Sequence, residues 1–125
     1  MIGSVYGLAS NPSAGITEIR FTIGLAPGAL PIDLTKMKIV FSTPSTTPII
    51  LTQGATATTS IFTTKLNGAS NVNLMNPNDQ IEIAFKVSPV SPNTKTNIEL
   101  RPSVGAALPF SKTAPATIAA TNILY

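Results

Sequence analysis

Alternation of apolar and polar residues with a period of two constrains this chain more than any other feature of its sequence. The segment Ile16–Ser42 shows the alternation twice, before and after a loop rich in proline and glycine. Because successive side chains of a strand point to opposite faces, the pattern predicts two strands. A helical period would scatter Arg20 and Lys38 among the buried residues. The alternating apolar residues are Ile19, Phe21, Ile23 and Leu25 before the loop and Met37, Ile39 and Phe41 after it.

Shorter segments of the same kind continue to the end of the chain, separated by proline, glycine and asparagine. Ile49, Ile50 and Leu51 predict a short buried run, and no segment with a helical period intervenes. The remaining predicted strands are an edge strand beginning near Val5, Ile61–Leu66, Gln80–Ser88, Asn97–Arg101 and Ala116–Tyr125. We therefore predict an all-β fold, an immunoglobulin-like antiparallel β-sandwich of about seven to nine strands in two sheets. It forms a single domain over residues 1–125.

The surface of this predicted domain is unusually poor in charge. Only 10% of the residues are charged, and the mean hydropathy is +0.31. Small free-standing domains normally cover themselves with lysine, arginine, glutamate and aspartate. A surface of Thr, Ser, Asn, Ala and Pro loses little side-chain entropy when it is buried. We interpret it as a surface that meets other protein subunits. A high-salt medium and a threonine-rich secreted domain without a partner are the alternatives.

The residue types on which most catalysis depends are missing. The chain has no histidine and no cysteine, which excludes Ser-His-Asp and Cys-His nucleophiles and most zinc sites. Three glutamates fall at outward strand positions beside basic residues, and we interpret them as cross-strand charge partners. The glutamates are Glu18, Glu82 and Glu99, and the basic residues beside them are Arg20, Lys86 and Arg101. A glycosidase-like carboxylate pair is the alternative. We predict that the chain is not an enzyme. Its net charge of +3 is spread out, and its aromatics alternate with aliphatic residues, so no nucleic-acid partner is expected.

Asparagine-rich and aspartate-containing turns offer the candidates for metal binding. The segment Asn71–Gln80 contains four asparagines and Asp79, and Ca²⁺ prefers about six to eight oxygen ligands. The single carboxylate and the absence of EF-hand spacing favour an asparagine-lined turn instead. Asp33 likewise predicts a turn or one helical turn closed by its carboxylate. We expect no cofactor. Should Ca²⁺ or another divalent metal bind, the candidate ligands are Asn76, Asn78 and Asp79.

Two separated motifs resemble archaeal flagellins, the archaellins. The sequence FTIGLAPGA at 21–29, followed by PIDL at 31–34, resembles the segment that opens their outer domain. The C-terminal part resembles the end of the same proteins, from ELRP at 99–102 through LPF at 108–110 to NILY at 122–125. The resemblance covers the chain from about Ile16 to Tyr125 and is strongest to methanogen-type archaellins.

The resemblance implies a structural subunit of the archaellum filament, an extracellular organelle of swimming motility. In that family a long hydrophobic N-terminal helix builds the filament core, and the β domains form the outer shell. The helix is absent from residues 1–125, so we expect this chain to be the outer globular domain alone. Membrane contact is then expected only through the missing helix during assembly. The implied partners are other archaellin subunits in a helical filament, and contact with cell surfaces is a further expectation.

Two functions follow for the neutral surface. In a filament subunit it is the layer that contacts neighbouring copies, with Ile123 and Tyr125 in a buried end. The alternative is an envelope-binding module of an accessory archaellum protein or of an S-layer adhesin. The chain has only 5 Phe and 2 Tyr and no Trp, too few for a sugar-binding platform, so the subunit is favoured.

Overall fold

The computed structural model describes residues 2–9, 11, 13–24, 31–44, 46–54, 56–66, 69–70, 74–76, 79–102 and 107–124. Within these ranges the chain forms strands and one short 3₁₀ helix, which confirms the all-β prediction. Over the same ranges, no helix has the length and apolar character needed to cross a membrane. The elements are β1 (Ile2–Leu8), β2 (Ile16–Gly24), β3 (Ile32–Asp33), η1 (Leu34–Lys36), β4 (Lys38–Thr43), β5 (Thr46–Gln53), β6 (Ile61–Leu66), β7 (Ala69–Ser70), β8 (Leu74–Met75), β9 (Gln80–Val90), β10 (Lys95–Arg101), β11 (Leu108–Thr113) and β12 (Thr121–Leu124).

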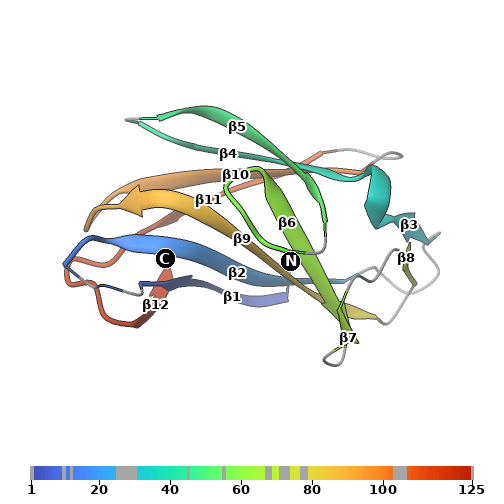
Figure 1. Cartoon of the computed structure of the whole chain (residues 1–125), viewed down its shortest axis with the longest axis horizontal. Coiled ribbons are helices and arrows are strands. Elements are labelled where there is room, and N and C mark those ends of the chain that lie inside the picture. Colours follow the sequence, from blue (N-terminus) through green and yellow to red (C-terminus); the bar gives the residue numbers. More distant parts are fainter. Residues whose placement is uncertain are drawn as a thin grey trace.

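Two layers of strands face each other, as the sandwich prediction requires, but they belong to one hydrogen-bonded sheet. Its order is β11-β10-β4-β5-β6-β9-β2-β1-β12, with β7 beside β6, and β3 and β8 form a separate pair. The sheet folds over so that β4, β5 and β10 form one layer and β1, β2, β9 and β12 the other (Figure 1). The predicted seven to nine strands correspond to the nine described strands of four residues or more.

The expectation of two separate antiparallel sheets is wrong at one corner. Strands β5 and β6 are parallel and pair only through Thr52 with Ile61 and Gln53 with Phe62. Backbone hydrogen bonds from Thr52 N–H to Ser60 O (3.1 Å) and from Gly54 N–H to Phe62 O (3.0 Å) close this corner. The chain therefore passes from one layer to the other without breaking the sheet.

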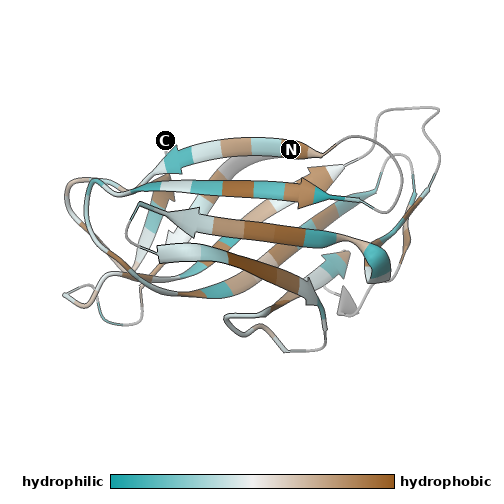
Figure 2. Cartoon of the chain, turned by 90° about the horizontal axis from the view of Figure 1, so that it is seen from above, coloured by the Kyte–Doolittle hydropathy of each residue, from teal (hydrophilic) through white to brown (hydrophobic). Residues whose placement is uncertain are grey.

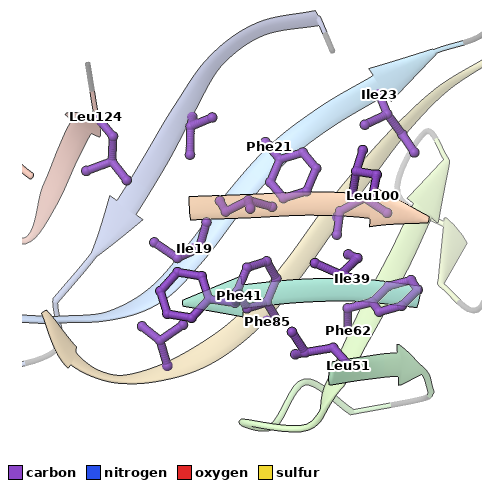
Figure 3. Packing of buried hydrophobic residues seen from close by; sticks show 14 of the residues in the cluster. Ile19, Phe21, Ile23, Ile39, Phe41, Leu51, Phe62, Phe85, Leu100 and Leu124 are labelled. Atoms are coloured by element: carbon purple, nitrogen blue, oxygen red, sulfur yellow. The ribbon is translucent and has the colours of Figure 1, made fainter. Parts of the chain in front are cut away.

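The alternating apolar residues meet between the two layers. The rings of Phe21 and Phe85 lie edge to face at 6.3 Å between centroids, and Phe41 and Phe85 lie 5.7 Å apart. Phe21 also contacts Phe110 at 5.6 Å. Phe21 and Phe85 come from β2 and β9 of one layer, whereas Phe41 and Phe110 come from β4 and β11 of the other. The contacts Phe41–Phe85, visible in Figure 3, and Phe21–Phe110 therefore join the layers. Each edge-to-face pair contributes about 0.5–1.5 kcal/mol beyond the burial of its area.

Strand β5 departs from its predicted buried run. Ile50 is 57% exposed, whereas its neighbour Leu51 is buried. The strand alternates like the others because only one face of its layer covers the core. Ile50 lies opposite Val40 of β4 on the outer face. Coloured by hydropathy, β4 and β5 each show a continuous apolar stretch, residues 39–41 and 49–51, so their alternation is one of burial and not of residue type (Figure 2).

The C-terminal part of the chain also differs from the prediction. The predicted strand over Ala116–Tyr125 is confined to Thr121–Leu124 among the described residues. A strand that the alternation did not predict, β11, precedes it and contains Pro109. Proline is tolerated there because β11 lies at the edge of the sheet, where a missing N–H leaves no partner unpaired.

Asp33 closes one helical turn, as predicted. Its carboxylate accepts the backbone N–H of Thr35 at 3.0 Å and also the Thr35 hydroxyl. The hydroxyl bond first, then the backbone bond, and to a smaller extent Lys36, hold the pKa of Asp33 below its ordinary value of 3.8. The cap thus fixes η1 at the end of the sandwich where β3 and β8 pair (Figure 1).

This cap gives the fold a defined response to acid. Because the pKa of Asp33 is lower in the folded than in the unfolded chain, its stabilisation is present above pH 3.8 and is lost as the pH falls through the folded-state pKa. Thr35→Val removes the hydroxyl donor and should raise the pKa of Asp33 toward its ordinary value. NMR titration of the Asp33 carboxyl carbon measures this pKa. An unchanged titration curve in Thr35→Val would show that the Thr35 hydroxyl does not lower the pKa of Asp33.

Removing the Phe85 ring should weaken the contact between the layers more than any surface change. Phe85→Ala is expected to lower the free energy of unfolding by about 3–5 kcal/mol, because the ring is fully buried and touches both layers. Urea denaturation measures the loss. Phe85→Leu keeps most of the apolar volume and should cost less than half as much. A loss below about 1 kcal/mol for Phe85→Ala would refute this role.

Candidate subunit-contact surface

Strand β12 brings the predicted contact residue Ile123 to the outer face of one layer. Asn122 and Leu124 are buried, and Thr121 and Ile123 are exposed. Ile123 is 56% exposed and lies opposite Tyr6 of β1, which is 42% exposed. Two large apolar side chains from opposite ends of the chain thus stand side by side in contact with solvent. Tyr125, the other predicted contact residue, lies outside the described residues, and its role stays a prediction.

The side chain of Asn122 determines which residues of β12 face outward. Its Oδ1 accepts the backbone N–H of Ala119 at 2.7 Å, and its Nδ2 donates to Ala119 O at 2.8 Å and to Gly7 O at 3.1 Å. A buried amide with these bonds satisfied holds the turn before β12 against β1. Because a slip of one residue would exchange the two faces, this anchor keeps Ile123 outside and Leu124 inside.

The residue pairs across this layer define a row of side chains on its outer face, which we call the Tyr6 row; within it Ala84 is buried. Arg20 is the charged residue of the row, and its Nε lies 2.8 Å from Oε2 of Glu18, two residues earlier on β2. A shallow depression of about 240 Å³ beside the row is lined by Tyr6, Leu8, Arg20 and Thr121 among others. The Tyr6 row consists, from β12 to β6, of Ile123, Tyr6, Arg20, Ala84 and Thr63.

A second row crosses the outer face of the opposite layer, and we call it the Val40 row. Glu99 is its charged residue and forms an ion pair with Arg101 on the same strand. An open depression of about 370 Å³ lies over the row and is lined by Val40, Glu99 and Pro109 among others. The Val40 row consists, from β11 to β5, of Pro109, Glu99, Val40 and Ile50.

The prediction of cross-strand charge partners is wrong, because Arg20, Lys86 and Arg101 each lie on the same strand as their glutamate. Across strands, Glu18 lies opposite Lys86 and Glu82 opposite Lys65, whereas Glu99 has the uncharged neighbours Val40 and Pro109. The two ion pairs that form instead, Glu18–Arg20 and Glu99–Arg101, join residues two positions apart on one strand. Such residues share a face of the sheet, so the longer arginine reaches back to the carboxylate.

The carboxylates do not converge on a catalytic pair. Glu82 lies on the outer face of β9 and Glu99 on the outer face of β10, in opposite layers. Asp33 caps η1 at one end of the sandwich. The core of the sandwich separates Glu82 from Glu99, so they cannot act together on one substrate, as a glycosidase requires.

The candidate metal ligands form a closed turn where they are described. The carboxylate of Asp79 accepts the backbone N–H of Asn76 at 3.0 Å, and the N–H of Asp79 donates to Asn76 O at 3.1 Å. Asn78 lies outside the described residues. In the part of the chain that the structure describes, no group of three or more His, Cys, Asp or Glu side chains gathers. Binding of Ca²⁺ or another divalent metal by Asn76, Asn78 and Asp79 stays a prediction.

The sequence alone does not identify Tyr6 or the residues of the Val40 row as members of a contact surface. The alternation of Tyr6 with the buried Val5 was visible in the sequence, but the pairing of β1 with β12 was not. The outward positions of Val40 and Ile50 follow from the same alternation in β4 and β5. Only the register places these two side chains next to each other.

Comparison with known proteins by sequence gives one family. Residues 1–112 match the family model of archaeal-type flagellin. A curated relative, probable flagellin 1 of Archaeoglobus fulgidus, is 26% identical over 139 aligned positions, which cover 99% of this chain and 68% of the relative.

Comparison with solved structures finds the same fold. The crystal structure of the archaeal flagellin FlaB1 from Methanocaldococcus jannaschii has a TM-score of 0.83 at 16% identity, covering 99% of this chain and 94% of that chain. The archaeal flagellum of Methanospirillum hungatei strain JF1 has a TM-score of 0.73 at 16% identity, covering 99% of this chain and 68% of that chain.

Loss of the Asn122 anchor should release β12. Asn122→Leu leaves the bonded groups of Ala119 and Gly7 unpaired, so the free energy of unfolding should fall by about 2 kcal/mol or more. Amide hydrogen exchange should accelerate first in β12 and in the paired part of β1. Asn97→Ala is the matched control, because Asn97 is exposed and its side chain bonds only to Ser111 in the structure. Equal protection of β12 in Asn122→Leu and the unmodified chain would disprove the anchor.

Proposed function

The chain belongs to the archaeal-type flagellin family, and we propose that its β domain forms the outer layer of an archaellum filament by packing against other copies of itself. A structural filament subunit is the role that the family match and the curated flagellin relative support. The fold shared with archaeal flagellins of known structure is consistent with that role.

The observation that carries the proposal is the exposure of large apolar side chains on both outer faces of a sandwich with few charged residues. Ile123 and Tyr6 stand on one face, and Ile50 and Val40 on the other. A domain that needs only solubility covers such positions with charged side chains. Contact with further copies removes these side chains from water, and the short neutral residues around them lose little entropy on burial.

The location and use of the filament follow from the same proposal. We propose an extracellular location on the cell surface and a role in swimming, because the family match is to archaeal-type flagellin. The partners are other archaellin subunits in a helical array. None of the observed features requires a cofactor or a nucleic acid for this function.

A charge placed in the Tyr6 row should impair filament formation without unfolding the domain. Ile123→Lys is expected to reduce the incorporation of this chain into filaments at least about tenfold, because burying an unpaired ammonium at the contact is costly. The free energy of unfolding should change by no more than about 0.5 kcal/mol, since Ile123 points to solvent. Electron microscopy and sedimentation of filaments from cells that produce the variant measure the first effect, and urea denaturation the second.

Thr47→Lys is the matched control, because Thr47 is exposed on β5 and belongs to neither row. It adds the same charge and should leave filament yield unchanged. Normal filaments from Ile123→Lys would refute the participation of this face, and equal losses in both variants would show a general effect of charge.

A further inference from the structure

We propose that Pro109 closes the free edge of β11 to strand addition, so that a second copy of this chain does not extend the sheet by pairing with it. β11 and β12 are the two ends of the main sheet, and an end strand presents unpaired backbone groups to other chains. β12 covers only Thr121–Leu124, whereas β11 covers Leu108–Thr113. β11 is therefore the longer template for an added strand. The inference goes beyond the proposed function and does not depend on it.

Hydrogen bonding with β10 determines which backbone groups of β11 face the free edge. The N–H of Ala114 donates to Thr94 O at 2.9 Å, so these two residues continue the register of β10 and β11 by one pair. In an antiparallel ladder, pairs that exchange hydrogen bonds alternate with pairs that do not. Counted from Thr94 and Ala114, the pair of Glu99 with Pro109 is one that does not. The backbone nitrogen of Pro109 therefore points away from β10, toward the free edge.

The edge of β11 thus lacks one donor in an otherwise regular row. By the same alternation, the N–H groups of Ser111 and Thr113 point to the free edge. An antiparallel pairing of two copies about Ser111 would place residue 109 of each copy opposite Thr113 of the other. Proline has no N–H, so the hydrogen bond from residue 109 to Thr113 O and its symmetry mate cannot form. The most extensive self-pairing of this edge is therefore excluded.

The other prolines within strands also lie on unpaired edges. Residues 46–51 of β5 have β4 as their only strand neighbour, since the described pairing with β6 begins at Thr52. Residues 87–90 of β9 have β2 alone, since the described pairing with β6 ends at Phe85. Proline on such an edge hinders strand addition and removes no bond from the ladder. In the described strands, the prolines are Pro48 of β5, Pro89 of β9 and Pro109 of β11.

Restoring the N–H at position 109 tests the inference. Pro109→Thr supplies the missing donor and should raise the self-association constant at least about tenfold over that of the unmodified chain, measured by sedimentation equilibrium at about 0.1 mM protein. Under the same conditions, amide hydrogen exchange should become slower at Ser111 and Thr113. Pro109 is exposed, so urea denaturation should show that the variant stays folded. Pro109→Ala restores the same donor and replaces Pro109→Thr if that variant does not fold.

A double variant is the matched control for the backbone donor. Pro109→Thr combined with Ser111→Pro keeps one proline in β11 and moves the missing donor two residues along the same edge. Because the N–H of Ser111 also points away from β10, proline at this position takes no hydrogen bond from β10. The double variant should associate as weakly as the unmodified chain. Pro92→Thr removes an exposed proline from the turn between β9 and β10 and should leave association unchanged.

Three results would overturn the inference. The first is association of Pro109→Thr no stronger than that of the unmodified chain. The second is stronger association without slower exchange at Ser111 and Thr113, because the contact would then lie elsewhere. The third is an equal gain in the double variant or in Pro92→Thr, because the gain would then not come from the donor at position 109.

These results leave the proposed function untouched, because they concern pairing at one edge of the separate domain. The proposed function is tested by incorporation into filaments in cells, where Ile123→Lys is compared with Thr47→Lys. Normal filaments from Ile123→Lys would count against the participation of that face and would leave the role of Pro109 standing.

Discussion

The edge-to-face contacts between phenylalanine rings of the two layers are the interaction on which the rest of the structure depends. Phe21 and Phe85 of one layer meet Phe110 and Phe41 of the other at centroid distances of 5.6 and 5.7 Å. Once these rings are buried, the alternation of each strand fixes which side chains face outward. The outward-facing side chains are therefore determined by the packing of the core. The side chain of one residue cannot change faces unless its whole strand shifts register.

The proposed function depends on repetition of a surface in a filament of many copies. The sandwich exposes Tyr6 and Ile123 on one outer face and Ile50 on the other. A low content of charge removes the repulsion that would keep copies apart. The hydrogen bonds of Asn122 link the fold to this surface, because they hold β12 in the register that exposes Ile123.

The sequence predicted what depends on local alternation and missed what depends on strand pairing. Phe21 and Phe41 are predicted as core residues because each occupies an alternating position. Ile50 was wrongly placed in a buried run, since three adjacent apolar residues conceal the alternation that the fold imposes. The strand β11 was missed because Pro109 suggests a break, which only an edge position permits. The Tyr6 row could not be predicted, because Tyr6 and Ile123 meet only through the pairing of the first strand with the last.

The most direct test of this account is a cryo-electron microscopy map of filaments that contain this chain, at a resolution that shows side chains. The account predicts that Tyr6 and Ile123 of one subunit are buried against an adjacent subunit. A map in which both side chains face solvent would contradict it.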